Sequence, residues 1–258
     1  MKMPVLCVKL GGSLITDKST PYKANITAIR NIARDLKSIK TPLLIAHGSG
    51  SFAHTSAKKY GGGHGYSLKL GVAKVARDAM EINRIIMDIF VEEGLPAISL
   101  RPMSMILSSG GKLKKNLFEI VEETLRQGLI PVVYGDIIWD TKWKSTIFSG
   151  EKTLNEIALY LKKRGFIVSK IIQVGKTNGV YDNKGKTIPL ISHKNWKNIK
   201  RYVFESKDAD VTGGMMHKIE NALSITDKNI ETQIINGTIS NELFNALHGK
   251  TMKGTVIS

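Results

Sequence analysis

Short apolar runs that end at glycine turns alternate with segments of helical periodicity along this chain of 258 residues. Residues 5–10, 43–46 and 129–133 have the length and apolar character of buried strands. Residues 26–39 and 72–90 carry apolar side chains at the spacing of amphipathic helices. Strands that alternate with helices build a parallel sheet with helices on both faces. The pattern therefore predicts an α/β fold, a three-layer αβα sandwich with a mainly parallel central sheet.

The chain is long enough for one large α/β domain or for two lobes, and it contains no repeat and no low-complexity linker. Its weakest seam lies at residues 148–152. We therefore expect a single domain over residues 1–258, with an N-lobe over 1–148 and a C-lobe over 149–258.

The composition is that of an ordinary globular protein, with 42% hydrophobic and 23% charged residues. No apolar run approaches the ~20 residues that cross a bilayer. Gly11 and Gly12 interrupt the apolar N-terminal segment, unlike the pattern of a signal peptide. We expect no membrane partner and a cytoplasmic location. The single cysteine, Cys7, excludes an internal disulfide, and its place in a predicted strand favours a buried, inert thiol.

The formal net charge of +16 is the unusual property of the composition. Such a charge is compatible with nucleic-acid binding, with a general affinity for anions, or with a lysine-rich solvated surface. The lysines are scattered, and their small groups at residues 112–115 and 194–201 are not interleaved with stacking aromatics. We therefore expect no nucleic-acid partner. Nucleic-acid binding remains an alternative, which a steep salt dependence would support.

The first apolar run ends in a turn suited to an anion. Lys9 stands at the end of the predicted strand, and Gly11, Gly12 and Ser13 follow it. Glycines let backbone N–H groups approach a phosphate closely, Ser13 adds a hydroxyl, and Lys9 supplies a fixed positive charge.

A second glycine turn, at residues 47–54, follows the next predicted strand and is flanked by two histidines. His47 lies at the strand end, where a structural hydrogen bond to the loop is the favoured interpretation. His54 lies just beyond a predicted helix start, where its ring can donate to a phosphate, so we favour a functional role for it.

Two further turns open helices at residues 149–152 and 210–218, and Lys218 lies one turn into the second of them. The loops after parallel strands share one edge of a sheet, which is where ligands bind. A Gly-x-x-x-x-Gly-Lys-Ser/Thr motif does not occur, so the chain is not a P-loop enzyme.

Four motifs occur together: Lys-Leu-Gly-Gly-Ser at residues 9–13, Thr-Asp-Lys at 16–18, His-Gly-x-Gly at 47–50 and Asp-Val-Thr-Gly-Gly-Met at 210–215. This combination resembles the amino acid kinase superfamily, over nearly the whole chain, and implies the amino acid kinase fold. Within it, His54 and Lys18 are similar to the isopentenyl phosphate kinases. Acetylglutamate, aspartate and uridylate kinases do not carry the histidine, whereas the fosfomycin-resistance kinases do.

The resemblance implies an ATP-dependent phosphotransferase that converts isopentenyl phosphate to isopentenyl diphosphate in isoprenoid biosynthesis. It also implies Mg²⁺ bound mainly through the nucleotide phosphates, a homodimer, an acceptor phosphate on the N-lobe and a nucleotide on the C-lobe. The implied catalytic residues are Lys9, Lys18, His54 and Lys218. The residues implied to bind the nucleotide are Lys9, Leu10, Gly11, Gly12, Ser13, Gly50, Gly214 and Lys218. Those implied to bind the acceptor are Ser49, His54 and Gly150, and the apolar helix at residues 72–90 is expected to line the pocket for its tail.

The chain departs from the family pattern in places. The family's Ser-Gly-Asp-Asp is replaced at residues 149–152 by a sequence with Glu151 and Lys152, and its Thr-Asp-Val-Asp-Gly at 175–179 carries Lys176 and Asn178 instead of carboxylates. One hypothesis is that Glu151 organises the lysines through its longer side chain. These losses keep two alternatives open: a kinase of a small phosphonate such as fosfomycin, and a catalytically silent nucleotide-binding protein.

Overall fold

The computed structural model describes residues 2–17, 19–61, 69–205 and 214–258. Lys18, to which a catalytic role is assigned above, lies outside the described residues, as do residues 210–213 of the fourth predicted turn.

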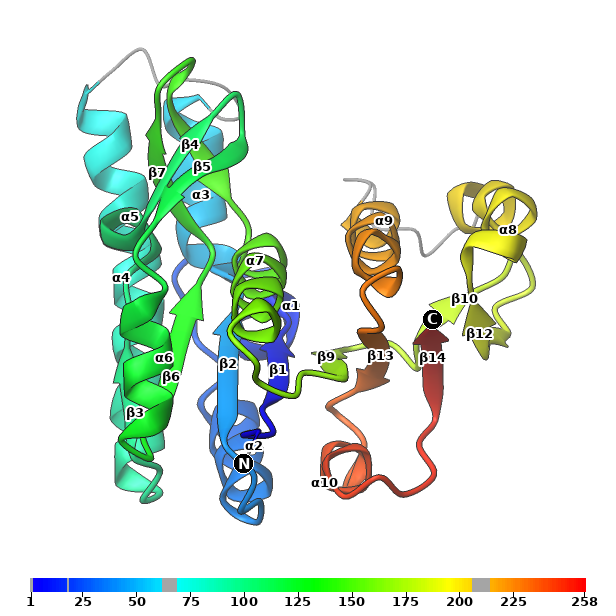
Figure 1. Cartoon of the computed structure of the whole chain (residues 1–258). Helices are drawn as coiled ribbons and strands as arrows, with labels where there is room; N and C mark the ends of the chain where they lie inside the picture. The colour runs from blue at the N-terminus through cyan, green and yellow to red at the C-terminus, as the bar shows by residue number, and fades with distance from the viewer. Residues whose placement is uncertain (1, 18, 62–68, 206–213) are drawn as a thin grey trace.

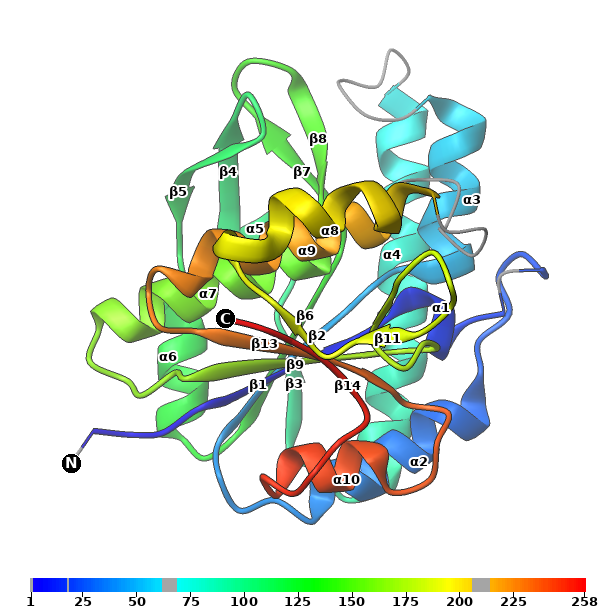
Figure 2. The same ribbon diagram turned by 90° about the vertical axis from the view of Figure 1, so that its right-hand side faces the viewer.

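An eight-stranded sheet runs through the middle of the molecule (Figures 1 and 2). Its strands, in spatial order, are β12 (Leu190–Ile191), β14 (Gly254–Ile257), β13 (Glu231–Asn236), β9 (Lys170–Gly175), β1 (Leu6–Leu10), β2 (Leu43–His47), β6 (Ile130–Tyr134) and β3 (Ala97–Ser99). All neighbouring strands are parallel except β13 and β14. The predicted mainly parallel sheet is confirmed.

Helices cover both faces of this sheet, which confirms the three layers (Figure 2). One face packs against α2 (Ile26–Lys37), α4 (Lys69–Glu92) and α10 (Glu242–Leu247). The other face packs against α6 (Glu119–Arg126), α7 (Gly150–Lys163) and α9 (Gly214–Thr226), and α8 (His193–Glu205) lies beside α9. Side chains alternate between the two cores along β1, with Val8 in the first and Cys7 in the second.

Two sequence signals explain the boundaries of the predicted helices. Asn25 caps α2, because its side-chain oxygen accepts a hydrogen bond from the N–H of Ala28 at 3.2 Å. Gly94 follows α4 with a φ of +81°, a conformation that glycine adopts without strain. The sequence did not predict helix α8, which is rich in lysine, although its Trp196, Ile199 and Val203 recur at helical spacing and pack against the cluster around α9.

A second sheet of four strands stands beside the upper part of α4 (Figure 1), and it was not predicted. Its order is β5 (Lys112–Asn116), β4 (Ile106–Ser109), β7 (Asp136–Asp140) and β8 (Lys144–Phe148). Strand β5 reads Lys-Leu-Lys-Lys-Asn, so it lacks the apolar pattern of a strand. Contacts distant in sequence hold the turn between β4 and β5. The buried carboxylate of Asp140 accepts hydrogen bonds from Ser108 and from the N–H groups of Gly110 and Gly111.

The remaining described elements are short, apart from α3. They are α1 (Gly12–Ile15), α3 (Gly50–Tyr60), α5 (Pro102–Met105), and the two-stranded sheet of β10 (Val180–Tyr181) and β11 (Thr187–Ile188).

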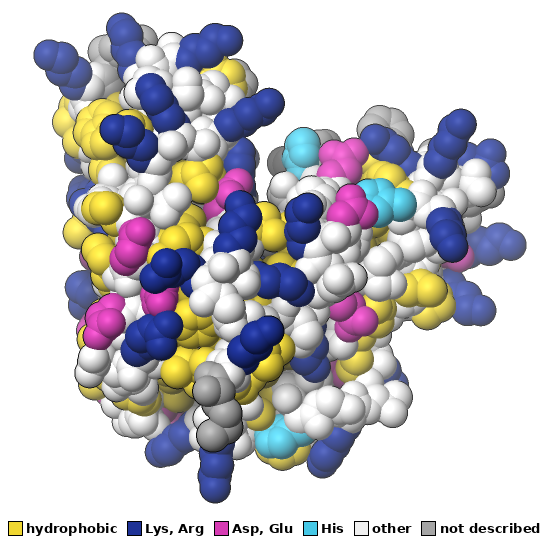
Figure 3. All heavy atoms as spheres, in the orientation of Figure 1, with side chains coloured by type: hydrophobic (Ala, Val, Ile, Leu, Met, Phe, Trp, Pro, Cys, Tyr) yellow, Lys and Arg dark blue, Asp and Glu magenta, His cyan; other side chains and the backbone are white. Residues whose placement is uncertain are grey.

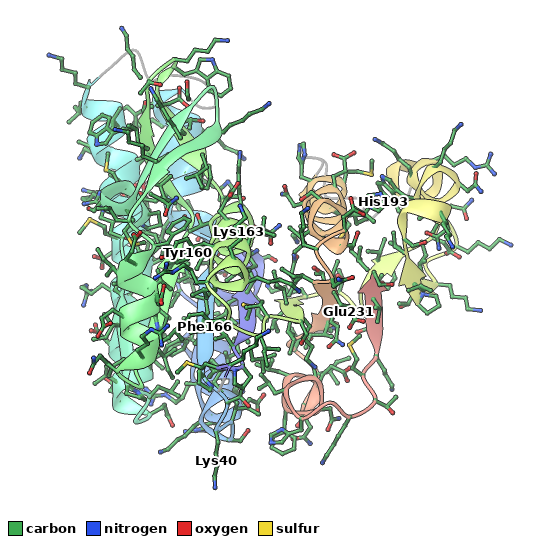
Figure 4. The ribbon with its side chains drawn as sticks, in the orientation of Figure 1. Lys40, Tyr160, Lys163, Phe166, His193 and Glu231 are labelled. Carbon is green, nitrogen blue, oxygen red and sulfur yellow. The ribbon has the colours of Figure 1, made fainter. Side chains whose placement is uncertain are left out.

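The layer of α6 and α7 is held by side chains that Figure 4 helps to locate. The Tyr160 hydroxyl donates to the Glu122 carboxylate at 3.2 Å, and Arg126 lies 5.1 Å above the Phe166 ring. Burial raises the pKa of Cys7, in the core beneath this layer, to about 12, which agrees with the expected inert thiol. In the described part of the chain, no helix has the length and apolar character to cross a bilayer.

Candidate active site

The turn after β1 lies directly against the turn after β2. The N–H of Gly11 donates to the carbonyl of Val174 at 2.7 Å, and the N–H of Gly48 donates to Leu10 at 3.0 Å. A Cβ atom on Gly12 would come within 2.7 Å of the backbone nitrogen of Gly50. Both turns therefore need glycine because two backbones pack here without space for side chains. The predicted meeting of the first two loops is confirmed.

Thr16 joins these two turns, and the sequence analysis gave it no role of its own. Its side chain is fully buried; the hydroxyl donates to the carbonyl of Gly12 at 2.7 Å and accepts from the N–H of Ser51 at 3.0 Å. A Cβ atom at Gly50, which has a φ of +50°, would clash with the same threonine hydroxyl. The position of Thr16 just after a glycine turn was the only sequence signal for this role. Its bond to Ser51 in the second turn is shown by the structure alone.

The start of α7 completes the same edge of the sheet. Ser149 caps this helix by accepting from the N–H of Lys152 at 3.2 Å. A Cβ atom on Gly150 would lie 2.5 Å from the carbonyl oxygen of His47, so this helix begins in contact with the end of β2. The Ser49 hydroxyl donates to the carbonyl of Gly135 at 2.6 Å, and Ser49 is 7% exposed. The N-termini of α3 and α7 thus lie close together, and both favour an anion.

Glu151 pairs with one lysine of the pocket and lies within the electrostatic influence of another. The Lys9 ammonium, only 4% exposed, is bonded to the Glu151 carboxylate, across 142 positions of sequence. Burial acts to raise the pKa of Glu151, but the charge and hydrogen bond of Lys9 and the charge of Lys218 hold it below its ordinary value. The lowered pKa keeps Glu151 ionised beside Lys9. That Glu151 organises both lysines stays a hypothesis.

A pocket of about 510 Å³ opens beside these charges. Lys9, Gly11, Ser13 and Asp17 line it from the N-lobe, and Lys218 from the C-lobe. Its further lining residues are Ser19, Gln173, Val174, Gly175, Lys176, Thr177, Gly179, Val180, Tyr181, Val203, Met215 and Ile234. The pocket therefore has a cationic end at the glycine turn and a more apolar end near α8 and α9.

The two histidines of the second loop differ in exposure. His47 is fully buried; Nδ1 lies 3.1 Å from the carbonyl of Gly48, Nε2 lies 3.0 Å from the amide of Asn83, and the ring stacks on Tyr134. Burial lowers the pKa of His47 to about 4, and the charge of Lys9 lowers it further. The hydrogen bond that the ring donates to the carbonyl of Gly48 acts in the opposite direction. His47 is thus a neutral structural residue at neutral pH. His54 is exposed on α3, one turn after Gly50.

The substituted positions make contacts of their own. The Lys152 ammonium binds the carbonyl of Gly111 in the β4–β5 turn and lies 4.7 Å from the Phe148 ring. Its charge is therefore engaged at the second sheet, away from Lys9. Asn178 accepts a hydrogen bond from the amide of Asn236 at 2.9 Å, so a neutral amide pair stands where the family has a carboxylate.

Most basic side chains lie on the surface. Figure 3 shows Lys and Arg distributed over the visible face with no single continuous patch. Among the described residues, no group of three His, Cys, Asp or Glu side chains is placed to hold a metal ion.

Comparison with known proteins shows which family this architecture is similar to. A profile described as "Amino acid kinase family" matches residues 4–236. The isopentenyl phosphate kinase of Methanocaldococcus jannaschii is 32% identical over 97% of this chain and 97% of its own length. That of Methanothermobacter thermautotrophicus is 28% identical over 98% of this chain and 99% of its own. A solved isopentenyl phosphate kinase structure, 26% identical, superposes with a TM-score of 0.83 over 98% of this chain and 100% of that chain.

The profile extends from the strand that carries Lys9 to the end of β13, and so includes the glycine turns, Glu151 and Lys218. The similarity and the three-layer fold agree, and this chain belongs to the amino acid kinase family.

Proposed function

We propose that this protein is a phosphotransferase that moves the γ-phosphoryl group of ATP onto the phosphate of isopentenyl phosphate, giving isopentenyl diphosphate. The observation that carries the proposal is that Lys9, which is bonded to Glu151, and Lys218 line one pocket beside turns built from glycine. The curated relatives, which match over nearly their full length, are named isopentenyl phosphate kinases.

The chemical problem is the approach of two anions. Two unit charges ~4 Å apart repel by about 4 kcal/mol at an effective dielectric constant near 20, and each phosphate carries more than one charge. Phosphoryl transfer needs little covalent help, so positioning and positive charge supply most of the rate. Lys9 and Lys218 provide that charge at the cationic end of the pocket, which the turn at Gly11 and Ser13 also lines. The N–H of Gly11 is committed to Val174, so we assign the backbone donors of this turn to Gly12 and Ser13.

The acceptor phosphate fits beside the helix starts at Ser49 and Gly150. The Ser49 hydroxyl proton is committed to Gly135, so we infer that the backbone of this turn, rather than the hydroxyl, donates to the acceptor. His54 supplies a further donor from α3. The acceptor phosphate is already an anion, so no general base is needed and His54 acts by positioning and neutralising charge. Lys18 keeps its implied role in stabilising the transferred group.

An apolar cluster next to α3 favours an alkyl acceptor over a small polar phosphonate. Ala53 of α3, Val75 and Ala79 of α4, and Ile137 of β7 pack together there. Val72 and Met103 lie against the same cluster. An isoprenoid tail needs such an apolar neighbour, whereas fosfomycin does not. We therefore assign the tail to the region between α3 and α4.

Mg²⁺ would be held chiefly by the nucleotide phosphates. Glu151 is paired with Lys9, and the Asp17 carboxylate accepts from Ser19 and Thr20, so neither is uncommitted as a ligand. This donor set suits an ion that keeps several waters and takes its other ligands from phosphate oxygens. When bound, the ion neutralises charge on the β- and γ-phosphates.

The assembly and location follow the same proposal. We propose a homodimer that uses the β3 edge surface, defined by the exposed apolar residues Val91, Ile98, Leu117 and Ile120. We assign the nucleotide mainly to the C-lobe and the acceptor to the N-lobe, and place the reaction in the cytoplasm, where ATP is supplied.

An ADP-release assay tests the proposed reaction. It compares isopentenyl phosphate with dimethylallyl phosphate, fosfomycin, acetylglutamate and UMP, in the presence of ATP. We expect the highest kcat/KM for isopentenyl phosphate. Preference for fosfomycin would transfer the assignment to a phosphonate kinase, and ADP binding without turnover on any acceptor would identify a silent homologue.

Matched variants test the site. Lys218→Ala and His54→Ala should each lose turnover while remaining folded, since both remove positive charge or a donor from the phosphates. Their neighbours provide the controls: His217→Ala on α9 and Lys58→Ala on α3, both exposed, should keep turnover. Unchanged turnover in both site variants would refute the assignment.

A further inference from the structure

A buried glutamine faces the cationic end of the pocket and takes no part in the roles described above. Gln173 lies on β9, is only 5% exposed, and lines the pocket. Its Oε1 atom is fully buried and, among the described residues, has no hydrogen-bond partner. A buried carboxamide oxygen without a partner costs free energy in the folded state, so its presence needs an explanation.

The sheet register places Gln173 beside Lys9. The Cα atoms of Gln173 and Lys9 are partners in the parallel β1–β9 ladder, and Ile234 is the partner of Gln173 on β13. Partners in a parallel ladder point to the same face. Gln173 therefore shares the face of Lys9, beneath the helices that carry Glu151 and Lys218.

We propose that Gln173 is a binding residue for the phosphate chain of the nucleotide. Its Nε2 group donates to a phosphate oxygen, and its Oε1 atom turns to an ammonium group of the same cluster. The inference rests on the proposed nucleotide site and deepens it. A carboxamide supplies both a donor and an acceptor without adding charge, and so it suits a place between phosphate and lysine.

The position of Gln173 in the sheet indicates that it contacts the phosphates of the nucleotide rather than the nucleoside. Its nearest partner in the ladder toward the N-lobe is the charged Lys9, at the glycine turn. The apolar lining residues Val180, Val203 and Met215 belong to the cluster around α8 and α9, which suits a base. A hydrogen bond to a charged group is stronger than one between neutral groups, so its loss has a measurable effect on affinity.

The chain offers a matched control in Gln233. This residue lies on the neighbouring strand β13, and its Oε1 atom is also buried without a partner among the described residues. Its partner in the ladder is Ile172, so it lies on the opposite face of the sheet from Gln173, and its Nε2 group donates to Glu231 at 2.8 Å. Gln233 does not line the pocket.

Calorimetric titration of the full chain tests the proposal, with ADP and inorganic tripolyphosphate as the two probes. We expect Gln173→Leu to lower the affinity for both ligands by about tenfold or more. Gln233→Leu should change neither by more than about twofold. The Tm of Gln173→Leu should not fall, because the substitution removes a buried polar atom that has no partner.

Three results would overturn the proposal. Gln173→Leu binds both probes as tightly as the wild type, or Gln233→Leu loses as much affinity as Gln173→Leu. In the third result, Gln173→Leu loses affinity for ADP but not for tripolyphosphate, which would assign Gln173 to the nucleoside. Gln173→Glu is the second variant if Gln173→Leu does not fold: it keeps the shape but places a carboxylate beside the phosphates, and wild-type affinity in it would contradict the proposal. A wild-type protein that binds both probes yet fails to phosphorylate isopentenyl phosphate refutes the acceptor assignment alone.

Discussion

Glu151 is the residue that we propose to organise the two lysines of the pocket. The buried Lys9 ammonium is bonded to it, and the charge of Lys218 also acts on its carboxylate. A buried ion pair that loses one partner leaves an uncompensated charge. If the proposal holds, removing the charge of this one carboxylate changes where the positive charge lies.

Glu151→Gln should lower kcat by about 10- to 100-fold, because the amide keeps the shape but no longer fixes the two ammonium groups. The affinity for ADP should fall much less, since both lysines remain. Steady-state kinetics and ADP titration measure the two effects. Glu156→Gln, on the same helix and half-buried, is the matched control and should keep its turnover. Equal kcat values in the two variants would contradict the role given to Glu151.

Two buried titratable residues make opposite contributions to stability between pH 4 and 6.5. Burial lowers the pKa of His47 from 6.5 to about 4, so the unfolded chain binds more protons there, and stability falls as the pH drops through this range. Burial raises the pKa of Asp136 from 3.8 to about 6, against Arg101, so the folded chain binds more protons and stability falls as the pH rises. Each group contributes roughly 3 kcal/mol across its range.

The two contributions can be separated by mutation. Relative to the wild type, His47→Gln should give a free energy of unfolding that falls more steeply from pH 4 to 6, because His47 no longer opposes the contribution of Asp136. Asp136→Asn should show the reverse slope, with stability lost below pH 6.5. Urea unfolding at a series of pH values measures both. Parallel pH profiles in the two variants would show that these buried groups do not control the slope.

At the scale of elements, the sequence predicted what depends on local pattern. The apolar spacing of α2 and α4 and the glycine turns after β1 and β2 are all local, and each is present in the structure. The second sheet escaped prediction because β5 is lysine-rich and is fixed by contacts of Asp140 that are distant in sequence. The Thr16 link and the Lys9–Glu151 pair are likewise long-range contacts, so residue spacing could not reveal them.

The cap of α2 gives a test at this scale. Asn25→Ala should lower the free energy of unfolding by about 1 kcal/mol, because the N–H of Ala28 loses its acceptor. The loss could be somewhat larger, since the same side chain also donates to the carbonyl of Leu14 at 3.2 Å. Asn31→Ala, at an exposed position of the same helix, is the control and should change stability by less than about 0.5 kcal/mol. Chemical denaturation of both variants measures the free energy of unfolding. If Asn25→Ala lowers it no more than Asn31→Ala does, the cap does not stabilise the helix as described.

At the scale of the whole molecule, the sheet brings residues from both halves of the chain to one pocket. Lys9 and Ser13 come from the first half of the chain, whereas Gln173 and Lys218 come from the second. β1 pairs with β2 on one side and with β9 on the other, so the first strand joins the strands of the two halves into one sheet. The proposed reaction brings two phosphates together, and this arrangement supplies it with positive charge from both halves of the chain at one pocket.

The β3 end of the sheet carries the surface that we propose for a second copy of the chain. β3 is the last strand of the eight, and the β3 edge surface exposes Val91 by 62%, Leu117 by 54% and Ile98 by 40%. The ends of α4 and α6 lie next to β3 in Figure 1. Sheet edges and apolar patches of this kind are ordinarily covered in soluble proteins. The pocket lies on other strands, so dimerisation there leaves it open to substrates.

Ile98→Lys should therefore convert the proposed dimer to a monomer, because a charge at the centre of an apolar interface cannot be desolvated without a partner. Ile147→Lys is the matched control: Ile147 is also 40% exposed but lies on β8 of the second sheet, and the dimer should persist in this variant. Light scattering coupled to size-exclusion chromatography measures the mass of each. A wild-type monomer, or a dimer that survives Ile98→Lys, would refute the interface, whereas loss of the dimer in the control alone would move it to the second sheet.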